Sequence, residues 1–230
     1  MEKLFLINMT SLIQLKPSQI IFLIAVSILV VVGIFLIYFA IKKRVNQKKN
    51  FKDECYRTIR KIALYNDYYL LNKFIFKTEG SKTSTIDHIL IGEKYFYIIS
   101  SLYFDGNLSG KECDRSLFLT TKENGKNYTE NPLFNTKALI EEFSFKTDIP
   151  KSFFIGIVLV NDSCQVNLIL EKINNNEIPQ DERIYFICNN SKLKHLIKKI
   201  ESRNIKNISA SKLANVVTNL DKLNRKKRNG

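Results

Sequence analysis

The stretch that decides the fold runs from Thr85 to Gly110 and reads T-I-D-H-I-L-I-G-E-K-Y-F-Y-I-I-S-S-L-Y-F-D-G-N-L-S-G. It contains two short apolar runs, residues 85–91 and 95–99, with Gly92-Glu93-Lys94 between them. Short runs rich in Ile and Tyr that flank a glycine turn are typical of neighbouring β-strands. The stretch therefore predicts two paired strands.

The segments on either side predict the rest of an α/β fold. The apolar run F-F-I-G-I-V-L-V at 153–160 indicates a central strand covered on both faces. Asn124-Gly125 predicts a hairpin turn, and Pro132 suits the first turn of a helix. We expect helices at 54–64, 132–145, 191–202 and 209–222, and further strands at 68–76, 117–121, around Tyr128 and at 183–188. This order predicts a mixed sheet flanked by helices.

Several motifs in this order resemble a known family. They are I-D-H at 86–88, the glycine step at Gly106 and Gly110, and N-P-L-F-N-T-K at 131–137. Together they resemble the NERD (nuclease-related domain) family of the restriction-endonuclease-like superfold, over roughly residues 53–160. The resemblance implies a sheet whose carboxylates bind Mg²⁺ through oxygen ligands. The metal assists phosphodiester cleavage, and a lysine positions the attacking water.

The resemblance assigns candidate site residues one by one. Asp87 matches the family's first metal-binding aspartate, and His88 matches the histidine that follows it. Glu54 is the nearest candidate for the acidic residue of the first helix, although the family's Gly-Glu context is missing there. The glycine step places Ser100 and Leu102 where the family has the Glu and Lys of its Glu-x-Lys motif.

The departures from the family pattern predict a degenerate site. Ser100 and Leu102 bring neither a carboxylate nor an ammonium, and Asn135 replaces the family's usual Gln. Asp87 alone would bind Mg²⁺ weakly, because hard cations require several anionic oxygens. We therefore expect no catalytic residues and no cofactor, with Asp87 as a weak metal ligand at most.

Two other interpretations of these residues stay open. Asp105, Lys111 and Glu112 lie near the degenerate positions in sequence, so a displaced acid and base would restore a Mg²⁺-dependent site. Alternatively, Asp87 inside an apolar strand has a structural role, such as a hydrogen bond or a pairing with His88.

Residues 20–41 predict a membrane anchor. All 22 are apolar except Ser27 and Gly33, and as a helix they would extend about 33 Å, slightly more than the hydrocarbon core of a bilayer. The run is longer than that of a signal peptide, and basic residues follow it rather than precede it. By the positive-inside rule, residues 1–19 form an outer tail and the chain from Lys42 onward is cytoplasmic. We expect a single-pass protein of the cell membrane.

Charge divides the chain into distinct regions. The net charge is +14, but residues 61–190 carry −3, while residues 42–60 carry +6 and residues 191–230 carry +10. We therefore expect a basic linker at 42–52, a NERD-like domain at 53–190 and a basic helical region at 191–230. A slightly acidic body does not predict a nucleic-acid-binding face on the sheet domain.

The basic C-terminal region has three open interpretations. It would bind the phosphates of nucleic acid, return to anionic lipid, or remain a solvated tail. The residues concerned are Lys192, Lys194, Lys198, Lys199, Arg225, Lys226, Lys227 and Arg228.

The four cysteines and two histidines lack zinc-ligand spacing, so a zinc site is not expected. The functional hypothesis is a membrane-anchored, catalytically degenerate module that binds nucleic acid, lipid or protein. The alternative is a membrane-tethered Mg²⁺-dependent DNA nuclease with a displaced active site.

Overall fold

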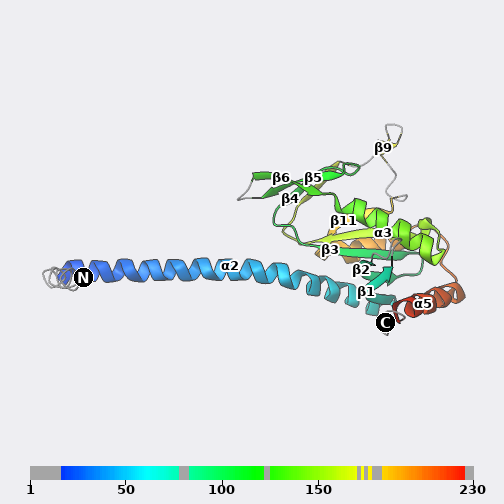
Figure 1. Ribbon diagram of the computed structural model, residues 1–230, viewed down its shortest axis with the longest axis horizontal. Helices are drawn as coiled ribbons and strands as arrows, with labels where there is room; N and C mark the ends of the chain where they lie inside the picture. The colour runs from blue at the N-terminus through cyan, green and yellow to red at the C-terminus, as the bar shows by residue number, and fades with distance from the viewer. Residues whose placement is uncertain are drawn as a thin grey trace. The chain divides into compact units, whose positions relative to one another are not determined.

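The computed structural model describes residues 17–77, 83–121, 125–169, 172–173, 176–177 and 183–225 (Figure 1). The tail before Pro17, Asn124 of the predicted hairpin turn, and Lys226, Lys227 and Arg228 lie outside the described residues. The chain divides into two compact units, Met1–Asn50 and Phe51–Gly230.

Helix α2 comprises Pro17–Asn66 and passes through both units. Its segment Ser18–Phe39 has a mean hydropathy of 3.4 and no buried residue, so it is long and apolar enough to cross a membrane. Residues 42–52, predicted as a linker, are helical. The reason is local: from residue 34 to the end of the helix the chain has no Gly or Pro, and Lys, Arg and Gln favour helix.

The main sheet confirms the predicted α/β class. It has five strands in the order β1-β2-β3-β7-β11, with β1, β2 and β3 antiparallel and β3, β7 and β11 parallel. The strands are β1 Tyr69–Lys77, β2 Thr83–Ile91, β3 Phe96–Leu102, β7 Phe154–Val160 and β11 Tyr185–Asn189. Every residue of β7 is buried, as its continuous apolar run predicts.

Helices cover both faces of this sheet and create two cores. Helix α4, Leu193–Glu201, and the last turns of α2 pack on one face, where Tyr97 and Ile157 are buried. Helices α3, Pro132–Thr147, and α5, Ala210–Arg225, contribute to the core on the other face. The side chain of Asn131 accepts a hydrogen bond from Leu133 N at 3.0 Å and so caps α3.

A second sheet has the order β6-β5-β4-β8, and its β5–β6 hairpin lies apart from the main sheet in Figure 1. The hairpin was predicted, but β4 and β8 were not. The strands are β4 Asn107–Lys111, β5 Ser116–Thr121, β6 Gly125–Glu130 and β8 Val166–Ile169. The remaining short elements are β9 Lys172–Ile173, β10 Asn176–Glu177 and two 3₁₀ turns at Lys151–Phe153 and Asn190–Lys192.

Gly156 in β7 provides a test of how closely α3 packs on the main sheet. A Cβ at this position would lie 2.6 Å from Thr136 Cγ2 and 2.8 Å from Tyr185 Cδ1. We expect Gly156→Ala to destabilise the domain by about 1–3 kcal/mol through overpacking. Chemical denaturation of the full chain in detergent measures this. Gly33→Ala, where a Cβ meets nothing within 4 Å, is the control; equal stability of the two variants would contradict the packing.

Candidate functional site

Asp87 lies in β2, and both of its carboxylate oxygens have partners. Oδ2 accepts a hydrogen bond from the backbone N–H of Ser101 in β3 at 3.0 Å. Oδ1 accepts one from Lys52 Nζ of α2 at 3.3 Å. The Asp87 side chain is 25% exposed and that of Lys52 is 65% exposed, so the ion pair is at the surface of the domain. The carboxylate therefore links α2, β2 and β3.

His88 is buried and has a structural environment. Its Nδ1 lies 2.7 Å from Asn72 Oδ1, and the Tyr56 ring stacks on the imidazole with centroids 6.1 Å apart. Burial lowers the pKa of His88, an effect that the Asp87 carboxylate opposes and the Lys52 ammonium increases. A neutral imidazole with its proton on Nδ1 donates to Asn72. The sequence also suggests a structural pairing of Asp87 with His88, but no described hydrogen bond or ion pair joins these two side chains.

The backbone beside Asp87 is distorted. Lys73 in β1 lies between the partners of Ile86 and His88 and has φ of 50°, which is uncommon for a residue other than glycine. Asp87 and His88 both contact side chains of α2, although consecutive strand residues normally point to opposite faces. The distortion thus directs two neighbouring polar side chains toward one helix.

Ser100 and Leu102 lie on the other face of β3. The Ser101 side chain is buried on the α2 face, where its hydroxyl is close enough to affect the thiol of Cys55. Because strand side chains alternate, Ser100 and Leu102 point away from α2, and Leu102 is 38% exposed. The structure describes no bond between either residue and Asp87.

Lys52 is the residue that sequence reasoning missed, because it was assigned to the linker. Its signal was helical spacing: Lys52 and Tyr56 are four residues apart and neighbour the buried stripe of Phe51, Cys55 and Ile59. Glu54 is exposed, and no described hydrogen bond or ion pair joins it to Asp87. Burial raises the pKa of the Cys55 thiol to about 12, so this sulfur stays protonated.

No described hydrogen bond or ion pair joins the displaced candidates to Asp87. Glu112 is buried and its Oε2 pairs with Arg183 at 2.9 Å. Asp105 and Lys111 are exposed, and neither has a described bond to Asp87. Within the described ranges there is no group of three or more His, Cys, Asp or Glu side chains that could hold a metal ion. One carboxylate already paired with an ammonium does not fit the Mg²⁺ site that the superfold implies.

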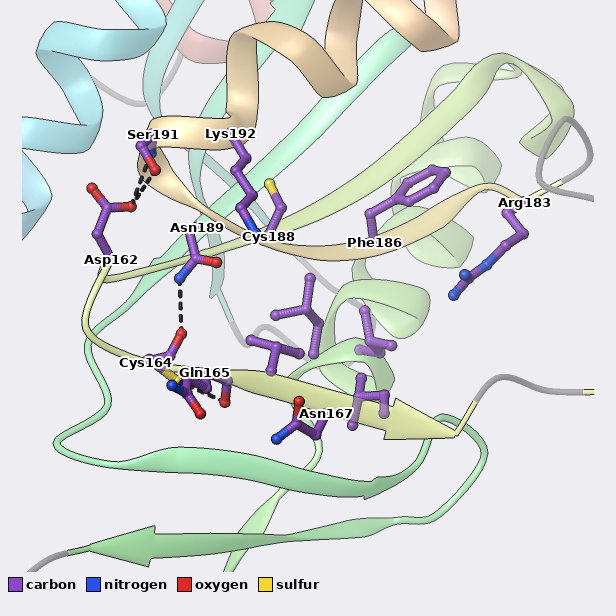
Figure 2. A pocket seen from close by; sticks show the side chains of 14 residues that line it. Asp162, Cys164, Gln165, Asn167, Arg183, Phe186, Cys188, Asn189, Ser191 and Lys192 are labelled. Carbon is purple, nitrogen blue, oxygen red and sulfur yellow. Dashed lines mark hydrogen bonds between the residues drawn. The ribbon is translucent and has the colours of Figure 1, made fainter.

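A cavity of about 520 Å³ lies between β8, β11 and the turn that follows β7 (Figure 2). At one end Asp162 Oδ1 accepts hydrogen bonds from Ser191 N at 3.0 Å and Ser191 Oγ at 2.8 Å. Asn189 Nδ2 donates to the carbonyl of Cys164 at 2.8 Å and holds the wall together. Lys192, the first residue of the predicted basic set, lines the same cavity.

The other described lysines of that set lie on the outer face of α4. Lys194, Lys198 and Lys199 are exposed, while Leu193 and Ile197 on the opposite face are buried in the core. Lys194 Nζ lies 4.7 Å from the centre of the exposed Tyr65 ring. The helix therefore belongs to the sheet domain and presents a basic surface.

The buried His88 generates a pH-dependence prediction. Its folded-state pKa is below the ordinary value of 6.5, so the unfolded state binds the proton more readily. Stability should therefore fall as pH drops from 7 to 5, and His88→Gln should remove this part of the loss. Denaturation of both proteins across that range measures it. The same change at the exposed His195 should keep the parental pH dependence; identical pH dependence in all three proteins would contradict the assignment.

Comparison with known proteins identifies one related family. Residues 49–161 match the family model described as nuclease-related domain, which covers the last part of α2, β1 to β7 and the Asp87 site. Curated proteins and solved structures give no match. Residues 49–161 therefore match the NERD (nuclease-related domain) family, the family that the sequence motifs resemble.

Proposed function

We propose that the chain is a single-pass membrane protein whose nuclease-related domain works on the cytoplasmic side as a binding module without Mg²⁺-dependent nuclease activity. The observation that carries this proposal is the occupation of the Asp87 carboxylate by Lys52 Nζ and by the N–H of Ser101. These partners supply positive charge and a hydrogen-bond donor at the position where the family's metal would require further anionic oxygens.

One observation favours the alternative, a Mg²⁺-dependent DNA nuclease with a displaced site. Lys52 supplies an ammonium beside Asp87, and the superfold uses a lysine to position the attacking water. Against this alternative, the described residues contain no group of three or more His, Cys, Asp or Glu side chains that could hold a metal ion. For this reason the binding role is the stronger proposal.

The basic surface of α4 supports a polyanionic partner. Lys194, Lys198 and Lys199 form this surface, and Lys192 precedes the helix. Arg225, Lys226, Lys227 and Arg228 extend the positive charge in sequence. Phosphate groups of nucleic acid or of anionic lipid would pair with these side chains in a salt-dependent manner.

A cleavage assay tests the absence of nuclease activity. Full-length protein in detergent is incubated with supercoiled plasmid and Mg²⁺ or Mn²⁺, beside Asp87→Ala and Lys52→Ala. We expect no nicking above background in any sample, and salt-sensitive retardation of uncut DNA if nucleic acid is the partner. Cleavage by the parent that Asp87→Ala abolishes would overturn the proposal and establish the nuclease.

The anchor and its orientation rest on the sequence and on one segment of α2. Ser18–Phe39 has the length and hydropathy of a membrane span, and the lysines that follow it favour the cytoplasmic side for the rest of the chain. Its large apolar side chains are exposed, as lipid-facing side chains are.

Cysteine labelling tests the orientation. Cys113 is exposed, whereas Cys55 and Cys164 are buried. In sealed right-side-out membrane vesicles, a membrane-impermeant maleimide should label Cys113 only after permeabilisation, and Cys113→Ser should remove that signal. Ser11→Cys, in the predicted outer tail, should react without permeabilisation. The reverse pattern would place the domain outside the cell.

A further inference from the structure

Strand β6, Gly125–Glu130, is an unpaired edge of the second sheet. It is the terminal strand in the order β6-β5-β4-β8, and among the described strands it pairs with β5 alone. Lys126, Tyr128 and Glu130 are exposed, Tyr128 to 74%. An edge of this kind presents backbone groups that can pair with another strand.

The alternating hydrogen bonds between β5 and β6 show which backbone groups of β6 point away from β5. Asn131 N donates to Arg115 O at 2.9 Å, and Glu130 lies opposite Ser116 in the register. Because paired residues alternate along an antiparallel ladder, the odd-numbered residues of β6 bond to β5. The N–H and C=O groups of Lys126, Tyr128 and Glu130 therefore point to the free edge.

The sequence of the strand is complementary to itself. In an antiparallel pair with a second copy, a two-fold axis at Tyr128 places Lys126 of each copy opposite Glu130 of the other. All three outward-facing residues then exchange backbone hydrogen bonds, and opposite charges meet at both ends of the pair. An axis at Lys126 or Glu130 would instead place like charges directly opposite each other, which is unfavourable.

Aromatic side chains support the same register. Tyr128 pairs with Phe118 of β5 on the outer face of the sheet, with ring centroids 4.7 Å apart. With the axis at Tyr128, the two tyrosines lie opposite each other between two phenylalanines. This row of four rings crosses the interface, and cross-strand aromatic pairs stabilise sheets.

We propose that the partner of this edge is a second copy of the chain, and that two β6 strands join antiparallel around Tyr128 into one continuous eight-stranded sheet. The contact is isologous, so it closes at two copies. Lys126 on the free edge opposes pairing with unrelated strands, and in this register Glu130 of the second copy neutralises it. The inference is independent of the proposed binding function.

Charge exchange between two variants provides the test. In Lys126→Glu residues 126 and 130 are both glutamates, and in Glu130→Lys both are lysines. In the proposed register each variant therefore repels its own copy. We expect each alone to self-associate at least tenfold more weakly than the parent, measured by sedimentation of the full chain in detergent. A mixture of the two should recover the parental dimer, because each glutamate then meets a lysine.

The controls separate this pairing from other causes. Lys111→Glu reverses an exposed lysine on β4, an inner strand of the same sheet, and should leave the dimer unchanged. Recovery in the mixture excludes misfolding of the single variants as the reason for their weak association. A parent that sediments as a monomer, or a dimer that neither single charge reversal weakens, would overturn the proposal.

Discussion

Burial of β7 on both faces is the constraint on which the rest of the domain depends. A parallel strand with only apolar side chains needs cover on each side, and it receives this from α2 and α4 on one face and from α3 on the other. Pairing of β7 with β3 positions the end of β3, and pairing of β3 with β2 positions Asp87. The packing of helices and strands around β7 therefore determines where Asp87 lies.

The two partners of Asp87 explain how its carboxylate is accommodated in the fold. A carboxylate in a largely apolar strand needs partners, and here a backbone N–H and an ammonium supply them. Through these two contacts Asp87 connects α2, β2 and β3. Ser100 and Leu102, which the resemblance aligns with the family's Glu and Lys, carry no charge, so these two side chains need no charged partner on the opposite face of β3.

Local patterns could predict most elements but not the contacts between them. The continuous apolar run of β7, the Asn131-Pro132 helix start and the hairpin around Gly125 each contain their own signal, and the structure confirms them. Strands β4 and β8 were missed because Gly110 and the polar residues around them resemble turns. They form because Leu108 and Val166 pack in the core below the second sheet, which is a tertiary effect.

The contact between Lys52 and Asp87 shows the same limit at the candidate site. These residues are 35 positions apart in the sequence. Lys52 is one of several basic residues in this part of the chain, and the sequence does not indicate which of them contacts Asp87. Only the pairing of β2 with β3 and the packing of α2 over both select this lysine. An alignment on the glycine step predicts that residues 100 and 102 correspond to the family's Glu and Lys, but it cannot identify the cation that another element provides. The ion pair between Lys52 and Asp87 thus depends on tertiary contacts, which the motif around Asp87 does not reveal.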